Sequence, residues 1–174
     1  MNYLLRDEET ERLCFRPLNK EDFNAWLPFF EEKEILVYFG IDTKETQHTL
    51  CENWFTKVFH RYENNLGGMN AIILKETGAL IGQCGLLIQT VQGKERLEVS
   101  YSLLPEFRGF GYGSEAAIKC KEFAFENNIA SALMSMIHVD NKASEKVALK
   151  NGMSLETIID YEGMMAKIYT IEKG

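Results

Sequence analysis

The stretch RGFGYGSEAA, residues 108–117, joins an arginine to glycines at positions 109, 111 and 113. Glycine has no Cβ atom, so this spacing lets another group come very close to the main chain. The stretch also opens an expected helix, whose first N–H groups lack intrahelical acceptors and carry partial positive charge. These features predict a pocket for a phosphate or diphosphate, to which Arg108 adds charge. A flexible turn that only needs glycine is the alternative, but the coincidence of all these features favours the anion site.

Comparison with known phosphate-binding loops narrows the choice of phosphate-containing ligand. A P-loop ends in Gly-Lys-Ser/Thr, whereas Gly113 is followed by Ser114 and Glu115. A dinucleotide fingerprint requires glycine at position 114 and an acidic residue at the end of the next strand, where Asp140 is only weakly compatible. A kinase loop needs a partner lysine and a catalytic loop, and neither is visible. A nucleotide-binding protein is therefore the weakest of the alternatives.

Length, charge and cysteine content limit the kinds of function that the protein can have. The 174 residues predict one domain, 1–174, with a sizeable core. A net charge of −7 disfavours direct nucleic-acid binding and suits a cationic substrate, although solubility alone also explains it. No apolar run approaches a membrane span or a secretory signal, and the four cysteines form no CxxC pair. We therefore expect a cytoplasmic protein without a membrane segment or a metal site.

Hydrophobic periodicity predicts an α/β protein. Strands are expected at residues 11–18, 69–75, 80–90, 95–104, 131–139, 154–163 and 164–172, and helices at 19–30, 43–65, 114–127 and 141–152. Asn19 and Asn141 suit helix N-caps, and Pro28 should end or kink the first helix. The helix that follows the glycines should pack closely on a sheet, because its apolar face consists mostly of small residues.

Arg108, Gly111 and Gly113 form the pattern Arg/Gln-x-x-Gly-x-Gly/Ala, which resembles the acyl-CoA pyrophosphate loop of the GNAT acetyltransferases. TERLCFRPLNKED (10–22), LEVSYSLLPEFRGFGYGSEA (97–116) and NKASEKVALKNGM (141–153) are similar to the branch that acetylates ribosomal-protein N-termini (RimJ/RimL-like). The resemblance spans nearly the whole chain. It implies the GNAT fold, an α+β sheet of about seven mostly antiparallel strands that is flanked by four helices and splayed in the middle.

The resemblance further implies acetyl-CoA as cosubstrate and a primary amine as acceptor. The pantetheine arm would lie along backbone near residues 102–104, with Asn141 on the exit side and Lys146 reaching a phosphate. Asn141 also suits a plain N-cap, and Lys146 a solvated helix face. The implied cofactor-binding residues are Ser102, Leu103, Leu104, Arg108, Gly109, Phe110, Gly111, Tyr112, Gly113, Ser114, Asn141 and Lys146.

Acetyl transfer needs a neutral amine, yet α-amines and lysine amines, with pKa values of about 8 and about 10.4, are mainly charged at neutral pH. Glu98, on one strand face with Ser100 and Ser102, is the candidate general base. An exposed strand glutamate is the equally weighted alternative. Ser144, or a water, would reprotonate the thiolate, because Ala148 stands where many family members carry a tyrosine acid.

The acceptor stays open between a protein N-terminus and a small amine such as a polyamine, and the oligomeric state, including a homodimer, is equally open. Because the tyrosine is missing, a non-catalytic acyl-CoA sensor or scaffold is the second hypothesis. The histidines are expected to be structural or surface residues. In relatives the region of the aromatic cluster contributes to the acceptor pocket, although core packing is favoured for most of its members, Trp26, Phe29, Phe30, Tyr38 and Phe39.

Overall fold

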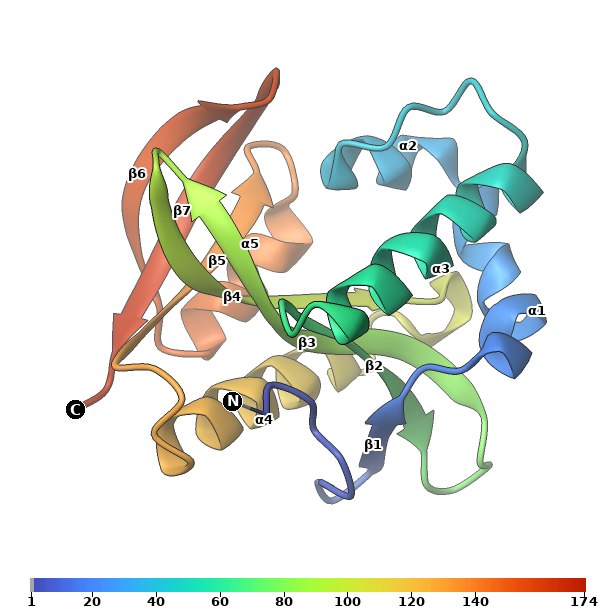
Figure 1. Cartoon of the computed structure of the whole chain (residues 1–174), viewed down its shortest axis with the longest axis horizontal. Helices are drawn as coiled ribbons and strands as arrows, with labels where there is room; N and C mark the ends of the chain where they lie inside the picture. Colours follow the sequence, from blue (N-terminus) through green and yellow to red (C-terminus); the bar gives the residue numbers. More distant parts are fainter. Residues whose placement is uncertain (1) are drawn as a thin grey trace.

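The computed structural model describes residues 2–174, and its centre is a seven-stranded sheet in the order β1-β2-β3-β4-β5-β7-β6 (Figure 1). The strands are β1 (Leu13–Pro17), β2 (Gly67–Leu74), β3 (Leu80–Val91), β4 (Lys94–Leu103), β5 (Ala132–His138), β6 (Ser154–Tyr161) and β7 (Met164–Glu172). Neighbouring strands are antiparallel except for β4 and β5, which are parallel. The mixed, mostly antiparallel sheet is thus confirmed.

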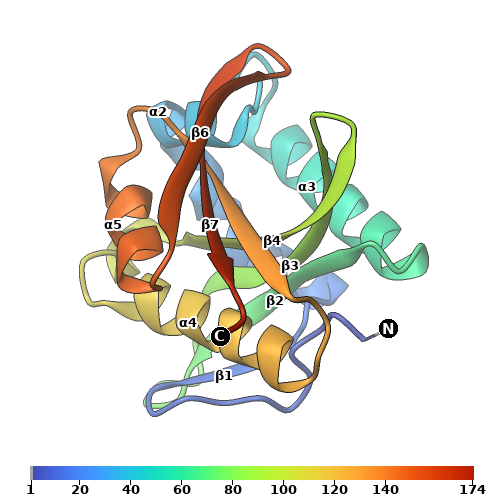
Figure 2. The same ribbon diagram turned by 90° about the vertical axis from the view of Figure 1, so that its left-hand side faces the viewer.

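Within residues 2–174, five α-helices flank the sheet instead of the four expected: α1 (Phe23–Trp26), α2 (Lys33–Leu36), α3 (Gln47–Glu63), α4 (Tyr112–Glu126) and α5 (Lys142–Lys150). The buried residues of α1–α3 pack with those of β2 and β3 in one hydrophobic cluster, and those of α4 and α5 join a second cluster. Figure 2 shows β5 and the β6–β7 hairpin from the side, with α5 beside them and α4 below. The sheet therefore has a helical layer on each face.

The prediction of one continuous helix at 19–30 is wrong, although the predicted cap at Asn19 and the predicted break at Pro28 are confirmed. Asn19 caps a 3₁₀ turn, Lys20–Asp22, by accepting a hydrogen bond from Glu21 N at 3.0 Å. The α-helical segment α1 ends at Trp26, and residues 27–31 continue as a 3₁₀ helix with Pro28 in its first turn. Proline has no N–H to donate along the helix, which explains the break. The chain then turns through α2, which supplies the fifth helix.

The small-residue face of α4 is buried as predicted: Ala116, Ala117, Cys120, Phe123 and Ala124 all lie in the core. The close packing reaches the first turn of the helix. A Cβ atom at Gly113 would lie only 2.8 Å from Cε2 of Tyr101 on β4. Glycine at this position therefore serves the approach of α4 to the sheet.

The sheet opens between β4 and β5. Strand β4 pairs with β3 along its whole length, from Leu103 opposite Gly82 to Lys94 opposite Val91. Its ladder with β5 within residues 2–174 consists of Glu98 opposite Met134. Past this pair the carboxyl-terminal halves of the two strands diverge, which confirms the expected splay.

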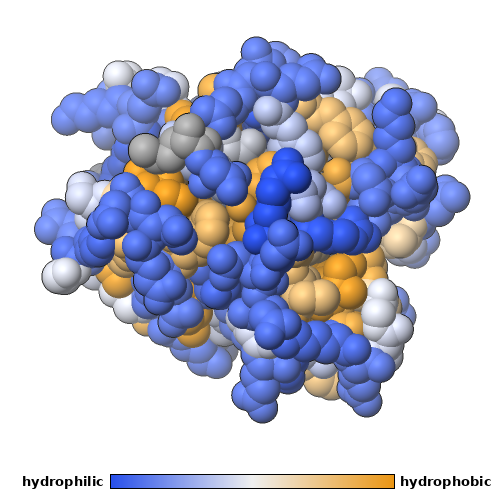
Figure 3. Space-filling model, turned by 60° about the horizontal axis from the view of Figure 1, so that its bottom comes forward, coloured by the Kyte–Doolittle hydropathy of each residue, from blue (hydrophilic) through white to orange (hydrophobic). Residues whose placement is uncertain are grey.

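The face brought forward in Figure 3 is mainly hydrophilic, and hydrophilic side chains separate its apolar patches. Among residues 2–174, no helix combines the length and the apolar character needed to cross a membrane.

Candidate active site

A cavity of about 310 Å³ occupies the opening between β4 and β5. Its walls come mainly from β3, β4, β5, α3, α5 and the segment after α2, and include Tyr38, Trp54, Lys57, Arg61, Gln89, Glu98, Ser100, Tyr101, Ser135, His138, Ser144 and Ala148. A groove of about 430 Å³ runs beside the glycine stretch. The two spaces have common walls at Tyr38, Phe39, Tyr101, Asn141, Ser144 and Val147. The groove beside the glycine loop and the cavity that contains Glu98 therefore adjoin along these residues.

The glycine loop presents bare backbone at the start of α4. Gly109 and Gly111 have φ angles of +86° and +85°, in the left-handed region that side chains avoid. Gly111 caps the helix without a side-chain hydrogen bond, and no acceptor within residues 2–174 takes the first-turn N–H groups of residues 112–114. A Cβ atom at Gly109 would meet nothing within 4 Å. The loop therefore has the open amides that an anion site requires.

Arg108 does not point freely into this groove. Its Nε donates to the carbonyl of Leu103 at 3.1 Å, and its Nη1 pairs with Glu32, which precedes α2. Its Nη2 is buried without a partner in the described chain. The guanidinium thus ties the end of β4 to the segment before α2. Lys146 and Lys150 line the same groove and supply further positive charge, and sequence analysis missed Lys150.

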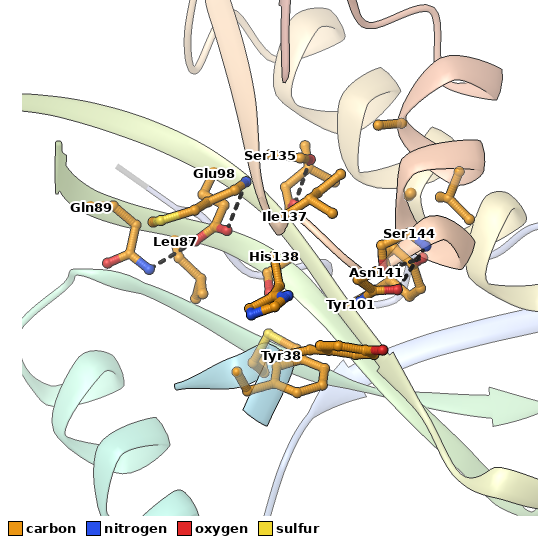
Figure 4. Close-up of a pocket in the computed structure, with 18 of the residues that line it drawn as sticks. Tyr38, Leu87, Gln89, Glu98, Tyr101, Ser135, Ile137, His138, Asn141 and Ser144 are labelled. Carbon is orange, nitrogen blue, oxygen red and sulfur yellow. Dashed lines mark hydrogen bonds between the residues drawn. The ribbon is translucent and has the colours of Figure 1, made fainter. Parts of the chain in front are cut away.

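Glu98 is buried, with 7% of its surface exposed, so the alternative of an exposed strand glutamate is wrong. Its Oε2 accepts from Gln89 Nε2 at 2.8 Å, and its Oε1 accepts from Met136 N at 3.3 Å (Figure 4). Arg61 Nη2 donates to Gln89 Oε1 at 3.0 Å, which fixes the orientation of the Gln89 amide. Burial raises the pKa of Glu98, while the two hydrogen bonds and the nearby Arg61 charge partly oppose that rise.

Three side chains gather at the start of α5, away from Glu98 in the cavity (Figure 4). Asn141 is the predicted N-cap, and its Oδ1 accepts from Ser144 N at 3.1 Å. The hydroxyl of Tyr101 donates to Ser144 Oγ at 3.1 Å, and burial raises the pKa of Tyr101. Because side chains alternate between the two faces of a strand, Tyr101 is expected on the apolar face, opposite Ser100 and Ser102. The sequence therefore carried no sign that its hydroxyl contacts Ser144.

Comparison with known protein families identifies the kind of protein in which such a cavity lies. Residues 12–154 match the family description "Acetyltransferase (GNAT) domain". The chain belongs to the GNAT acetyltransferase family. This GNAT chain is 35% identical over 147 residues to the uncharacterized protein YkkB of Bacillus subtilis (strain 168), with 83% of each chain covered.

Two solved structures share the GNAT fold. An acetyltransferase from Agrobacterium tumefaciens str. C58 superposes with a TM-score of 0.81 at 25% identity, covering 99% of this chain and 98% of its own. The ribosomal L7/L12 alpha-N-protein acetyltransferase RimL, solved in complex with coenzyme A, superposes with a TM-score of 0.75 at 16% identity, covering 95% and 97%. The protein is therefore an acyltransferase, as the resemblance implied.

The GNAT cavity also contains residues that sequence analysis assigned elsewhere. His138, expected to be structural or on the surface, lines the cavity, and its ring centroid lies 5.1 Å from that of Tyr38. Its Nδ1 accepts from Asp140 N at 3.1 Å, which leaves the proton of the neutral ring on Nε2. Trp54 and Lys57 of α3 were likewise missed. Helical spacing alone does not show which side chains face an opening in a distant sheet.

The aromatic cluster divides between core and cavity. Trp26, Phe29 and Phe30 are at most 2% exposed, as the core assignment requires. Tyr38 and Phe39 line the cavity.

Among residues 2–174, no three His, Cys, Asp or Glu side chains are grouped so as to hold a metal ion.

The groove suits a long ligand with phosphates at one end. Ser102 is 3% exposed and lines the groove, and its buried Oγ has no hydrogen-bond partner in the described part of the chain. A buried hydroxyl without a partner is unfavourable, so a polar atom of a ligand would stabilise it. Together with the open amides of residues 112–114, this fits coenzyme A.

Proposed function

We propose that the protein transfers the acetyl group of acetyl-CoA to a primary amine, with Glu98 as general base. One observation carries the proposal: the groove at the bare amides of α4 adjoins the cavity that holds the buried carboxylate of Glu98. Acetyl-CoA supplies a thioester when bound. The residues along the groove and the cavity would bind its phosphates, hold its arm and receive the proton of the amine.

The donor would lie along the open edge of β4. Leu104 N donates to Ile81 O of β3 at 2.9 Å, and peptide groups alternate between the two edges of a strand. The N–H of Leu103 and both peptide groups of Tyr101 therefore face the opening, where an extended pantetheine arm can pair with them, while the Leu103 carbonyl already accepts from Arg108 Nε. This supports Leu103 within the expected backbone segment and adds Tyr101. The amides of residues 111–114, with Lys146, would hold the diphosphate.

Glu98 is suited to accept the proton of the amine. Both of its oxygens face N–H donors, so the network favours the carboxylate, while burial raises its pKa towards the pH at which a base is useful. As the amine nitrogen bonds to the carbonyl carbon, the C–S bond breaks. Ser144, backed by the Tyr101 hydroxyl, would return a proton to the sulfur. Tyr101 thereby stands in for the tyrosine missing at position 148.

The cavity lining favours a monoamine over a polyamine. Glu98 contributes the carboxylate of this lining, and Lys57 and Arg61 contribute two cations. A polyamine needs several carboxylates for its several charges, so the net charge of −7 does not describe the site. A peptide N-terminus or a small monoamine fits better.

The test uses the full chain, acetyl-CoA and a panel of peptides and small amines, with thiol release as readout. Calorimetry measures the binding of coenzyme A beforehand. We expect binding and turnover with at least one amine, and Glu98→Gln should lower kcat about a hundredfold or more while retaining binding. Binding without turnover on any amine would favour the non-catalytic acyl-CoA sensor, and stabilisation by ATP or NAD instead would favour a nucleotide-binding protein. A cytoplasmic location and a homodimer stay predictions.

A further inference from the structure

The cavity is positively charged although the chain as a whole is acidic. Lys57 and Arg61 of α3 line it, and Glu98 is the only aspartate or glutamate among the lining residues of the described chain. The chain carries a net charge of −7, so composition alone predicts the opposite sign. Two cations beside one buried carboxylate therefore suit a ligand that brings a negative charge of its own.

Neither cation has a carboxylate to itself. Arg61 Nη1 donates to the carbonyls of Leu66 and Ile88 at 2.9 Å and 3.1 Å, and its Nη2 donates to Gln89 Oε1 at 3.0 Å. These acceptors are all neutral. Lys57 is exposed, and no ion pair joins it to any residue between positions 2 and 174. The positive charge of both side chains is therefore available to a ligand.

The helix itself offers no acid near Lys57. Side chains three and four positions away share a helix surface, and for Lys57 these are Asn53, Trp54, His60 and Arg61. None of the four is an acid, and Lys57 and Arg61 form an i, i+4 pair of like charge, which destabilises a helix. An anion bound beside them would offset this repulsion.

Coenzyme A does not account for these two cations. Its phosphates would lie in the groove, where Lys146, Lys150 and the open amides of residues 112–114 are found. The pantetheine arm and the thioester, which would extend from the groove into the cavity, are uncharged. The negative charge that suits the cavity is therefore expected from the acceptor.

The cations lie close to the proposed base. The single amide of Gln89 links Glu98 to Arg61, since its Nε2 donates to the carboxylate at 2.8 Å and its Oε1 accepts from Arg61 Nη2 at 3.0 Å. An amine that faces Glu98 and an anion that faces α3 are thus separated by only a few bonds. The cavity volume of about 310 Å³ is at the lower end for small-molecule pockets, which fits a single amino acid.

We propose that the acceptor is an amine that also carries a carboxylate, and that Lys57, with Arg61, binds this carboxylate while the amine faces Glu98. The inference rests on the proposed function and names its substrate class. The transfer itself is unchanged: the amine nitrogen bonds to the acetyl carbon, the C–S bond breaks, Glu98 takes the amine proton and the sulfur regains one through Ser144.

The test compares phenylalanine with phenylalaninamide, a pair in which the carboxylate is replaced by a neutral amide. The aromatic ring suits the walls formed by Tyr38, Trp54 and His138. With saturating acetyl-CoA, kcat/KM for phenylalanine should be about ten-fold higher or more, as expected for one charge-assisted hydrogen bond. The amide has the less basic amine, so the supply of neutral amine would favour the opposite order.

A second pair distinguishes a free amino acid from a peptide as the source of the carboxylate. It consists of a dipeptide amide that begins with aspartate and the same dipeptide amide with asparagine in that place. A preference for the acidic member in either pair supports the carboxylate site, and the pair with the larger preference identifies the source. Calorimetry of each acceptor with coenzyme A present should give the same order in binding.

Two variants and a control locate the carboxylate. Lys57→Gln should bring phenylalanine and its amide within about three-fold of each other, and Lys57→Glu should reverse the order. The preference is a ratio measured in one enzyme preparation, so a loss of folded protein cancels. Lys94→Gln removes the same charge at an exposed position that lines neither the cavity nor the groove, and it should keep the preference of the parent.

The outcomes separate this inference from the proposed function. If coenzyme A binds but none of the amines is acetylated, the proposed function fails. If amines are acetylated with equal kcat/KM for the two members of each pair, the carboxylate site is refuted and the proposed function stands. A preference that Lys57→Gln leaves at the parent value would also refute the site.

Discussion

Gln89→Leu tests the electrostatics of the candidate base without touching the base itself. Gln89 lies between Arg61 and Glu98, and its Nε2 donates to the carboxylate at 2.8 Å. Leucine has a similar volume but no donor, so the ionised form of Glu98 loses one of its two hydrogen bonds. Arg61 keeps its bonds to the carbonyls of Leu66 and Ile88, so it stays in place.

The size of the effect follows from the loss of one charge-assisted hydrogen bond. Such a bond contributes about 1.5–3 kcal/mol, and one pKa unit corresponds to about 1.4 kcal/mol. Burial already raises the pKa of Glu98, and the variant should raise it by about one to two further units. The acid limb of the kcat/KM profile against pH should move to higher pH by the same amount. At a pH on that limb, the rate should fall about ten- to a hundredfold.

Stability provides a second readout that needs no substrate. Because the pKa of Glu98 is higher in the folded than in the unfolded chain, the folded state keeps a proton that the unfolded state has lost. Stability therefore falls as pH rises from the unfolded pKa through the folded pKa, and Gln89→Leu should extend that fall to higher pH. Thermal unfolding across the acidic and neutral range measures it.

The control is Thr90→Val, an isosteric change at the exposed neighbour of Gln89, which should leave both profiles unchanged. An acid limb of Gln89→Leu that coincides with that of the parent, in a protein that still unfolds cooperatively, would refute the assignment of Glu98 as the titrating base. A lower rate at every pH without a shift would refute it as well.

Three further variants and one control variant test other parts of the site. Gly109→Ala and Gly163→Ala introduce a side chain at φ angles of +86° and +85° in equally open surroundings, so each should cost about 1–2 kcal/mol of stability, but only Gly109→Ala should weaken coenzyme A binding in calorimetry. Arg108→Gln breaks a partly exposed ion pair and should cost under about 1 kcal/mol for that pair, while loosening the segment before α2 and raising KM for the amine. Ser144→Ala should lower kcat about a hundredfold and leave the affinity for coenzyme A unchanged; an unaltered kcat would remove Ser144 from proton return.

Local sequence signals predicted the elements that local physics governs. Asn19 and Asn141 cap their helices because a cap needs only its own side chain and the next few N–H groups. The glycine stretch predicted bare amides at a helix start, and the N–H groups of residues 112–114 have no acceptor in the described chain. The helix expected at 19–30 failed because Pro28 and packing against α3 favour short 3₁₀ segments over one continuous helix.

The sequence by itself determined the family, the seven strands and the loop that can hold an anion, because these depend on residue types at short and regular spacings. The tertiary structure alone decided what surrounds each functional side chain. It brought Arg61 and Gln89 to Glu98, the Tyr101 hydroxyl to Ser144, and Glu32 to Arg108. These partners lie on different elements, so their meeting depends on strand register and on how each helix packs over the sheet, which no local pattern of residues encodes.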